Sequence, residues 1–286
     1  MFREMFFLLL FIPLFGEIRT IEGFEQIETE ISQADVDTLI VFDIDEVILT
    51  ALDQALKTPH KEIFRGIANE FMERAKGEEQ KKMIERRLSL SYLYPNRVLV
   101  EKMIAPLIRK LQGQGIYVLG ITRCRSGRYG VIPQVEQWRK EILAKNGINF
   151  NQGRFRGVGC SLNFSDSDKD SPRFEEGLLF GKGYAKDQLV SALINELQLP
   201  VKTIYIIDDE RSNLSKLEAL APYKVYPIEY LGAKKYLKNL SKRQARWQIK
   251  KLLQTGQWIE DEDINELGYI SGFFQYGIPS YVGTFF

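Results

Sequence analysis

Two aspartates two positions apart, Asp43 and Asp45, directly follow the apolar segment 38–42. The apolar segment predicts a buried strand, and open α/β sheets bind their ligands at the carboxyl ends of such strands. Residues i and i+2 of an extended chain project to the same side, so we expect both carboxylates at one site. Such a pair can divide phosphoryl transfer, because one carboxylate can attack phosphorus while the other moves a proton.

Two further side chains of use in phosphoryl transfer stand at the ends of predicted elements. Thr122 follows the predicted strand 116–121, and its hydroxyl can hydrogen-bond a phosphoryl oxygen. Lys186 precedes the predicted helix 187–197, where an ammonium can neutralise a carboxylate and the charge that develops on a phosphoryl group. Lys182 is the alternative in the same segment, and each of the two could instead be an ordinary solvent-exposed lysine with no role in a site.

A second pair of acids, Asp208 and Asp209, follows the predicted strand 203–207, and Asn213 comes four residues later. Two acids at the tip of a strand are costly unless they bind a cation or other partners, although a solvated turn explains such a pair equally well when it is taken alone. Oxygen ligands in a chain with one histidine favour Mg²⁺ over transition metals. The pair therefore predicts a magnesium site if it meets the other acids.

Alternation of strands and helices places these residues together. It predicts an α/β fold with a doubly wound parallel sheet, in which the strand tips at Asp43, Thr122 and Asp208 lie side by side. A hairpin is expected within residues 155–180, and a fifth strand at 223–227.

The chain is predicted to have four parts. Residues 1–16, with Arg3 before ten apolar residues, are typical of a signal peptide. Residues 17–51 and 110–233 form the α/β core, and residues 52–109 form a helical cap insert. Residues 234–286 form a carboxyl-terminal helical extension, whose basic residues we interpret as a solvated helix face.

Composition excludes several classes of protein. The 286 residues include 39 basic and 38 acidic ones, a balance that favours neither a nucleic-acid partner nor a membrane surface. His60 is the one histidine, which argues against a Ser-His-Asp triad and against multi-histidine metal sites. Cys124 and Cys160 form a disulfide if the chain is exported, or remain thiols. After the first residues no segment is long enough to span a membrane.

The four motifs resemble those of the haloacid dehalogenase-like superfamily of phosphohydrolases. The residues that match, in the order of that family, are residues 43–47, Thr122, Lys186, and Asp208 and Asp209 with Asn213. The resemblance covers about residues 36–230 and is closest to secreted, poorly characterised bacterial members. It implies a Rossmann-like core with a small helical cap.

The resemblance also implies roles for these residues. Asp43 would be the nucleophile, and Asp45 would protonate the leaving alcohol and then activate water. Mg²⁺ would be held by Asp43, by the backbone carbonyl of Asp45, and by Asp209 with the help of Asp208. The phosphoryl group would be bound by Thr122 and Lys186, and Arg123 could contact a second anionic group.

These expectations lead to a Mg²⁺-dependent phosphomonoesterase that acts on a small phosphorylated metabolite through an aspartyl-phosphate. The alternatives are a phosphomutase and a secreted binding or effector protein whose catalysis is vestigial. The signal peptide predicts a periplasmic or secreted protein, and a cytoplasmic one if the amino-terminal segment is retained. The sequence predicts no particular protein partner.

Overall fold

The computed structural model describes residues 16–57, 60–164, 171–238 and 240–264. The chain divides into two compact units. Unit 1 consists of Met1–Thr50, Val98–Arg128 and Gln134–Lys235, and unit 2 of Ala51–Arg97, Tyr129–Pro133 and Tyr236–Phe286. The predicted signal peptide lies outside the described residues except for Gly16, and it stays a prediction.

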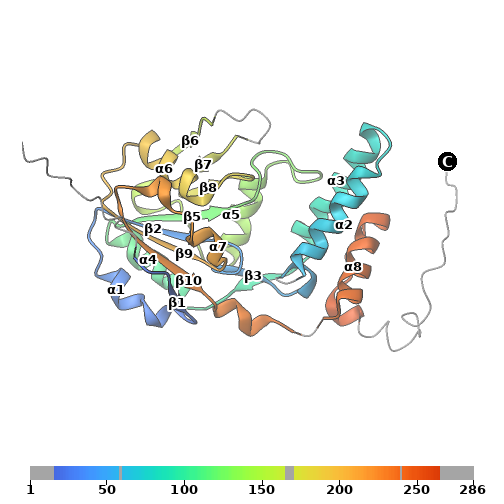
Figure 1. Ribbon diagram of the computed structural model, residues 1–286, viewed down its shortest axis with the longest axis horizontal. Helices are drawn as coiled ribbons and strands as arrows, with labels where there is room; N and C mark the ends of the chain where they lie inside the picture. The colour runs from blue at the N-terminus through green and yellow to red at the C-terminus, as the bar shows by residue number, and fades with distance from the viewer. Residues whose placement is uncertain (1–15, 58–59, 165–170, 239, 265–286) are drawn as a thin grey trace, which may run out of the picture. The chain divides into compact units, whose positions relative to one another are not determined.

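Unit 1 is built on an eight-stranded sheet (Figure 1). All neighbouring strands pair in parallel except at the β8–β7–β6 edge, which is antiparallel. The strands, in spatial order, are β1 (Arg19–Ile21), β10 (Lys224–Tyr230), β9 (Thr203–Asp208), β2 (Thr38–Asp43), β5 (Tyr117–Thr122), β8 (Leu178–Phe180), β7 (Arg173–Glu175) and β6 (Gly159–Ser161). The predicted α/β class with a doubly wound, mostly parallel sheet is confirmed. Part of the turn of the predicted hairpin, residues 165–170, lies outside the described residues.

Short helices connect these strands. The α-helices of unit 1 are α1 (Glu28–Ser32), α4 (Ile104–Gly113), α5 (Val135–Lys145), α6 (Lys186–Glu196) and α7 (Arg211–Leu214). The 3-10 helices are η1 (Phe24–Gln26), η3 (Gly153–Phe155), η4 (Glu218–Leu220) and η5 (Gly232–Tyr236), the last of which ends at the residue where the final segment of unit 2 begins.

Both faces of the sheet are covered, as the fully buried pattern of β2 requires. Successive residues of a strand point to opposite faces, so Leu39 and Val41 share one face and Ile40 and Phe42 the other. Leu39 and Val41 pack in one apolar cluster with Leu193 and other residues of α6. On the other face the ring of Phe42 lies 5.8 Å from that of Phe24, between the ring centroids. The central strand is therefore buried on both sides.

The carboxyl ends of β9, β2 and β5 lie side by side at one edge of the sheet. Phe42 pairs with Ile207 of β9, and Asp43 pairs with Ile121 of β5. From β2 the chain proceeds to β5 and β8 on one side and then returns to β9 and β10 on the other. The direction of winding thus reverses next to β2, which is where open α/β sheets bind ligands.

The described part of unit 2 includes the α-helices α2 (Lys61–Glu73), α3 (Glu78–Leu93) and α8 (Lys242–Thr255) and the 3-10 helix η2 (Gln54–Leu56). Their apolar faces form one cluster that includes Ile67, Leu88 and Leu253. Helix α8 begins with a capping box between Ser241 and Gln244. The two-stranded sheet of β3 (Leu49–Ala51) and β4 (Arg97–Leu99) stands where the chain enters unit 2 and returns from it.

The bounds of these units differ from the predicted parts. The predicted insert, 52–109, includes most of α4, whereas α4 lies in unit 1 and its Leu107 and Ile108 are buried. In the predicted extension, 234–286, helix α8 packs against α2 and α3 through Ile249 and Leu253. Helical periodicity shows which face of α8 is apolar but does not show what covers it.

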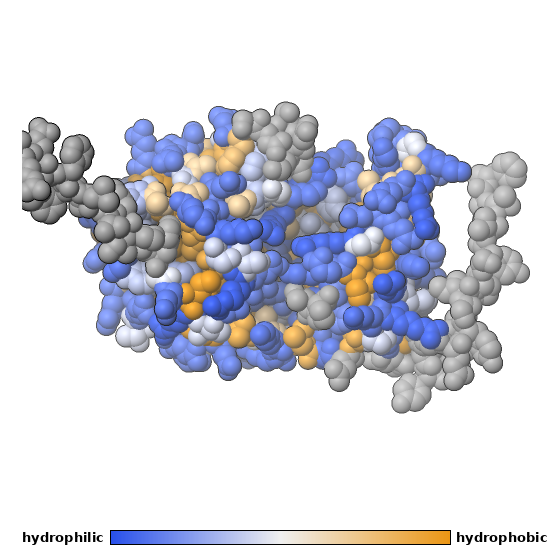
Figure 2. Space-filling model, viewed as in Figure 1, coloured by the Kyte–Doolittle hydropathy of each residue, from blue (hydrophilic) through white to orange (hydrophobic). Residues whose placement is uncertain are grey.

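Among the described residues, no helix combines the length and the apolar character needed to cross a membrane. On the face shown in Figure 2, hydrophobic residues form scattered patches among hydrophilic ones.

The stability of unit 2 is expected to depend on pH because of two acidic side chains. Asp53 is buried, its Oδ1 accepts a hydrogen bond of 3.3 Å from the backbone N–H of Asp261, and the Asp261 carboxylate lies nearby. Burial, with the charge of Asp261 adding to it, raises the pKa of Asp53 from 3.8 to about 6. The folded unit therefore binds this proton more tightly than the unfolded chain, and that advantage is lost as the pH rises from about 4 to about 6.

We expect Asp53→Asn to raise the free energy of unfolding at pH 7 by about 1 to 3 kcal/mol and to flatten its decline over this pH range. Urea unfolding at pH values from about 4.5 to about 7.5 measures the effect. It is followed by tryptophan fluorescence, to which Trp247 and Trp258 of unit 2 contribute. Asp263→Asn is the matched control, because Asp263 is exposed in the same segment. Equal pH dependence in the Asp53→Asn variant and the unmodified protein would contradict the prediction.

Candidate functional site

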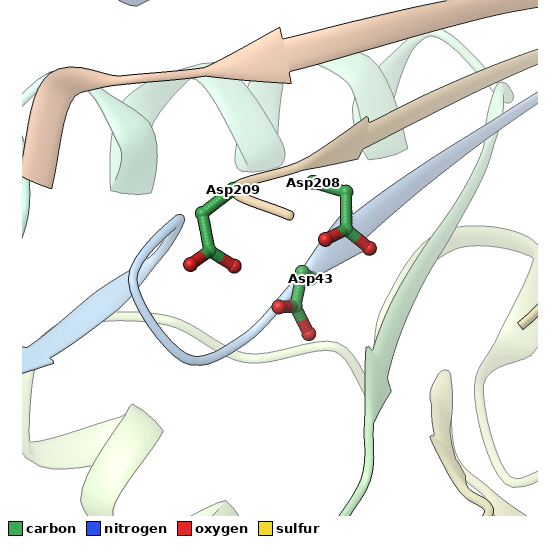
Figure 3. Close-up of side chains that lie close together, drawn as sticks. All are labelled: Asp43, Asp208 and Asp209. Atoms are coloured by element: carbon green, nitrogen blue, oxygen red, sulfur yellow. The ribbon is translucent and has the colours of Figure 1, made fainter. Parts of the chain in front are cut away.

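Three carboxylates meet at the carboxyl ends of β2 and β9 (Figure 3). Asp43, Asp208 and Asp209 each place a carboxylate oxygen within 4.8 Å of the other two. Asp43 continues the side-chain alternation of Leu39 and Val41, and Asp208 ends β9, so both project from the face that α6 covers. Asp43 and Asp208 are buried, and Asp209 is half-buried.

Lys186, the first residue of α6, reaches into this group. Its Nζ lies 2.9 Å from Oδ1 of Asp43 and 2.5 Å from Oδ2 of Asp208. Burial by itself would lower the pKa of Lys186, but the carboxylates of Asp43 and Asp208 outweigh burial and raise it. Lys182 is exposed, so the structure brings Lys186, and not Lys182, to the acids.

The remaining oxygen of Asp208 is also held in place. Its Oδ1 accepts hydrogen bonds from the backbone N–H of Glu210, at 2.9 Å, and from Nδ2 of Asn213, at 3.0 Å. The amide oxygen of Asn213 accepts a hydrogen bond of 3.0 Å from Nη2 of the exposed Arg123. Asn213 therefore links Asp208 to Arg123, the residue predicted to contact a second anionic group.

The group carries an excess of negative charge. Three ionised carboxylates and one ammonium leave a formal charge of −2. Burial raises the pKa of Asp43 well above its usual range; Lys186 opposes this shift, while Asp208, Asp209 and Asp45 add to it. A cation at these oxygens would relieve the repulsion that opposes the ionised form of Asp43.

A divalent cation fits this group in charge and in donor chemistry. A charge of +2 balances the formal −2, and all three donors are carboxylate oxygens, the ligands that Mg²⁺ and Ca²⁺ prefer. The carboxylate of Asp45 is not a member of the group. The predicted ligand from Asp45 is its backbone carbonyl, and that assignment stays a prediction.

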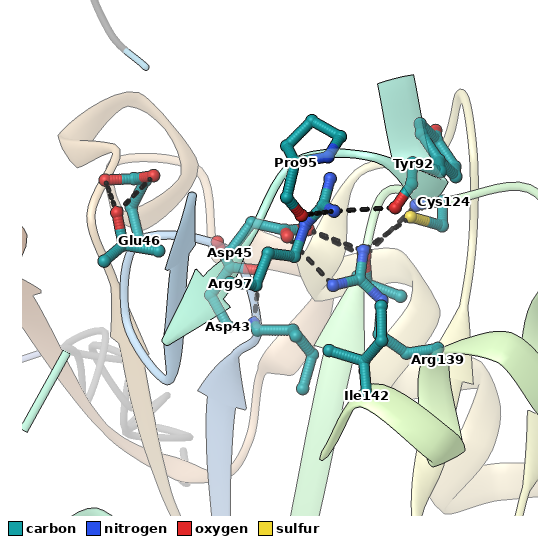
Figure 4. Close-up of polar contacts among 12 residues, drawn as sticks. Asp43, Asp45, Glu46, Tyr92, Pro95, Arg97, Cys124, Arg139 and Ile142 are labelled. Atoms are coloured by element: carbon teal, nitrogen blue, oxygen red, sulfur yellow. Dashed lines mark hydrogen bonds and ion pairs between the residues drawn. The ribbon is translucent and has the colours of Figure 1, made fainter. Parts of the chain in front are cut away.

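Asp45 belongs to a second group of side chains (Figure 4). Its two oxygens accept hydrogen bonds from Arg139 of α5, Nη1 to Oδ1 at 2.9 Å and Nη2 to Oδ2 at 3.1 Å. The hydroxyl of Thr122 donates to Oδ2 of Asp45 at 3.3 Å and accepts from the backbone N–H of Cys124 at 3.2 Å. Thr122 thus lies beside Asp45, at the end of β5.

The turn that carries Asp45 is tight. The N–H of Ile48 bonds to the carbonyl of Ile44 at 3.1 Å, and the N–H of Glu46 bonds to the carbonyl of Leu49 at 2.7 Å. Glu46 has φ of 66°, in the left-handed region that non-glycine residues rarely adopt. Such conformations cost about 1 to 3 kcal/mol each and cluster at functional sites.

Sequence reasoning missed Arg139. The residue lies four positions after Val135 and four before Leu143, so it stands on the apolar face of α5. A charged residue on the apolar face of a helix could have indicated this contact, because a buried charge nearly always has a partner. In the structure Arg139 is 2 % exposed.

The cysteines do not form a disulfide. Both are free thiols, Cys124 buried and Cys160 half-buried. Cys124 contacts the site, since Nη2 of Arg139 lies 2.9 Å from its Sγ.

One surface hollow lies apart from these residues. It has a volume of about 570 Å³ and is lined by Asn149, Asn151, Gln152, Gly153 and Arg156, none of which is a carboxylate, histidine or cysteine. We therefore locate the candidate site by its chemistry rather than by its concavity.

Comparisons with known proteins place the chain in a family. A family model described as "Protein of unknown function (DUF2608)" matches residues 20–265. The "Uncharacterized protein RP296" of Rickettsia prowazekii (strain Madrid E) is 25% identical over 243 residues, which cover 82% of this chain and 85% of that protein. No solved structure matches the chain.

These matches correct the resemblance drawn from the four motifs. The family that matches is distinct from the haloacid dehalogenase-like superfamily, and no model of that superfamily matches the chain. The motifs comprise one to five residues each at strand ends, where sites in many unrelated α/β proteins gather polar groups, so they are too short to identify a family. Because its model spans residues 20–265, the chain belongs to the DUF2608 family of proteins of unknown function.

Proposed function

We propose that the protein is a Mg²⁺-dependent phosphomonoesterase that acts on a small phosphorylated metabolite. The observation that carries the proposal is the position of Asp43, a buried carboxylate at a strand tip within 4.8 Å of two others and 2.9 Å from the ammonium of Lys186. A second carboxylate on the same turn, Asp45, is suited to move protons. These side chains, and not the fold, support the proposal, because one fold serves many functions.

The proposed reaction has two steps. In the first, an oxygen of Asp43 bonds to phosphorus, the bond from phosphorus to the alcohol oxygen breaks, and that oxygen takes up a proton from Asp45. In the second, water bonds to phosphorus and the bond to Asp43 breaks. The proton that water loses passes to the carboxylate of Asp45, and the carboxylate of Asp43 is regenerated.

The remaining residues of the site would stabilise charge. Mg²⁺, when held by Asp43, Asp208 and Asp209, would supply positive charge that offsets the charges of the nucleophile and the phosphate. Lys186 would neutralise carboxylate charge and, with the hydroxyl of Thr122, contribute to binding the phosphoryl group. Arg123, exposed beside Asn213, would contact a further anionic part of the substrate.

The test is phosphate release from an aryl phosphate and a panel of phosphorylated metabolites, with Mg²⁺ or with EDTA. We expect phosphate release with Mg²⁺ and none with EDTA. We also expect Mg²⁺ to raise the melting temperature, because saturation at 100 times Kd corresponds to about 2.7 kcal/mol of added stability. A thermal shift without turnover would favour a catalytically vestigial binding protein, and transfer of phosphate between positions of a substrate would favour a phosphomutase. Absence of both the shift and turnover would contradict the proposed site.

A further inference from the structure

We propose that Arg139 is a positioning residue, which holds the carboxylate of Asp45 in the orientation needed to take a proton from the attacking water. The inference rests on the proposed function and extends it to a further residue. Among the described residues, Arg139 contacts Asp45 and Cys124 rather than the three carboxylates or Lys186. Three features support the inference, namely the geometry of the pair, its uneven burial and the way α5 is fixed.

The contact between Arg139 and Asp45 is bidentate. Two guanidinium nitrogens meet the two carboxylate oxygens at 2.9 and 3.1 Å, which sets both the position and the plane of the carboxylate. A single hydrogen bond from lysine would leave that plane free to rotate, so arginine is specifically suited to this task.

Burial is very unequal across the pair. The side chain of Arg139 is 2% exposed, whereas that of Asp45 is 49% exposed. The guanidinium therefore supports the carboxylate from the protein interior and leaves it accessible from the open side. This is the arrangement expected of a group that must meet water and still keep a fixed orientation.

Arg139 is itself held in place on several sides. Nη2 of Arg139 contacts Sγ of Cys124 at 2.9 Å, and its guanidinium lies 4.8 Å from the ring centroid of Trp138. Both oxygens of the fully buried Glu136, one turn earlier on α5, accept hydrogen bonds from the N–H of Gly127 at 2.9 and 3.0 Å. Helix α5 is thereby fixed to the loop that follows β5, and the guanidinium has little freedom to move.

A contribution to folding stability is a poor explanation for the ion pair between Arg139 and Asp45. Burying a guanidinium costs several kcal/mol, and replacing a buried ion pair by apolar residues is often neutral or stabilising. Burial by itself would lower the pKa of Arg139, and the charge of Asp45 raises it above its usual value, so the charge is kept at this cost. A role in orienting Asp45 accounts for a charge at a position where an apolar side chain would fill the same volume.

The test separates the two steps of the reaction in the full-length protein with Mg²⁺ and an aryl phosphate. An aryl alcohol leaves readily with little help from a proton, whereas the attacking water must still lose one. A misplaced Asp45 in Arg139→Met is therefore expected to slow the second step more than the first. We expect kcat to fall about 10- to 100-fold, since a misplaced catalytic group costs about that factor. We also expect a rapid burst of about one aryl alcohol per enzyme before the slow steady state, which is the kinetic sign of an accumulating covalent intermediate.

Controls distinguish positioning from a general structural effect. Lys145→Met, which removes an exposed charge from the same helix, is expected to leave the kinetics unchanged. Arg139→Lys is expected to give an intermediate kcat, and it also tests the proposal if Arg139→Met does not fold. In an Asp45→Asn background, adding Arg139→Met should change kcat by less than about twofold, because a residue that acts through Asp45 has nothing left to position.

The outcomes differ for the two proposals. A wild-type protein that binds Mg²⁺ but releases no phosphate overturns the proposed function and, with it, this role of Arg139. An active wild type whose Arg139→Met variant shows no burst overturns the positioning role alone. If Arg139→Met lowers kcat equally in the wild type and in the Asp45→Asn background, that result also overturns the positioning role alone.

Discussion

Replacing Asp43 by asparagine is expected to lower kcat for phosphate release by at least about 10⁴-fold while leaving the protein folded. The amide keeps the shape of the side chain and an oxygen that can accept from Ile44 N–H and from Lys186, as Oδ1 of Asp43 does at 2.9 Å in each case. It is far less nucleophilic than a carboxylate, and losing the nucleophile of a covalent mechanism typically costs 10⁴ to about 10⁶ in rate. Measurement of kcat with saturating Mg²⁺ tests this.

The same substitution is expected to raise stability when no metal is bound. The folded state holds Asp43 with a raised pKa, so the ionised carboxylate opposes folding at neutral pH and the neutral amide does not. Asp43→Asn should therefore melt at a higher temperature than wild type in EDTA at pH 7, and should gain less from Mg²⁺. Asp35→Asn, at an exposed aspartate shortly before β2, is the matched control. Substantial activity in Asp43→Asn would exclude Asp43 as the nucleophile.

Replacing Lys186 by methionine is expected to cost about 3 to 5 kcal/mol of unfolding free energy at pH 7 without Mg²⁺. The substitution leaves the buried carboxylates of Asp43 and Asp208 without the ammonium that contacts both, and an uncompensated buried charge costs this much. The deficit should shrink as the pH is lowered, because protonation removes the carboxylate charge. It should also shrink with Mg²⁺, because a divalent cation supplies the missing positive charge.

The neighbouring Lys182 provides the control for this prediction. Lys182 is exposed four residues earlier, so Lys182→Met should change the free energy of unfolding by no more than about 0.5 kcal/mol. With Mg²⁺ bound, Lys186→Met should still lose about 10²- to 10³-fold in kcat, the range for removing a group that stabilises developing charge. Chemical denaturation at several pH values, with and without Mg²⁺, measures the first effect. Equal destabilisation by the two substitutions would contradict the role given to Lys186.

Local sequence patterns predict the strands that support the site. The apolar segments 38–42 and 203–207 become β2 and β9, each of which extends by one residue to include Asp43 or Asp208. Their adjacency follows from the alternation of strands and helices, since parallel strands present their carboxyl ends at one edge. That logic brings Asp43, Asp208 and Lys186 together, and the structure places them in contact.

The parts that could not be predicted depend on contacts between distant segments. Arg139 follows Asp45 by 94 residues in the chain, and nothing in the residues around either one identifies the other as its partner. The packing of α8 with α2 could not be predicted from the sequence for the same reason. Family membership was not readable from short motifs, because the same polar residues recur at strand tips of unrelated proteins.

The order of strands in the sheet has a consequence for the way this chain folds. Strand β2 is among the first elements to be synthesised, yet one of its two partners, β9, is among the last. Until residues 203–208 emerge, one edge of an almost wholly apolar strand has no partner, and such edges promote association between chains. A large loop must also close before Asp43 meets Asp208, so the entropy of closure is lost before the contact contributes any stability. Folding of unit 1 is therefore expected to be slow and to follow synthesis, and a chain that ends before β9 would lack both the β2–β9 pair and the group of three carboxylates.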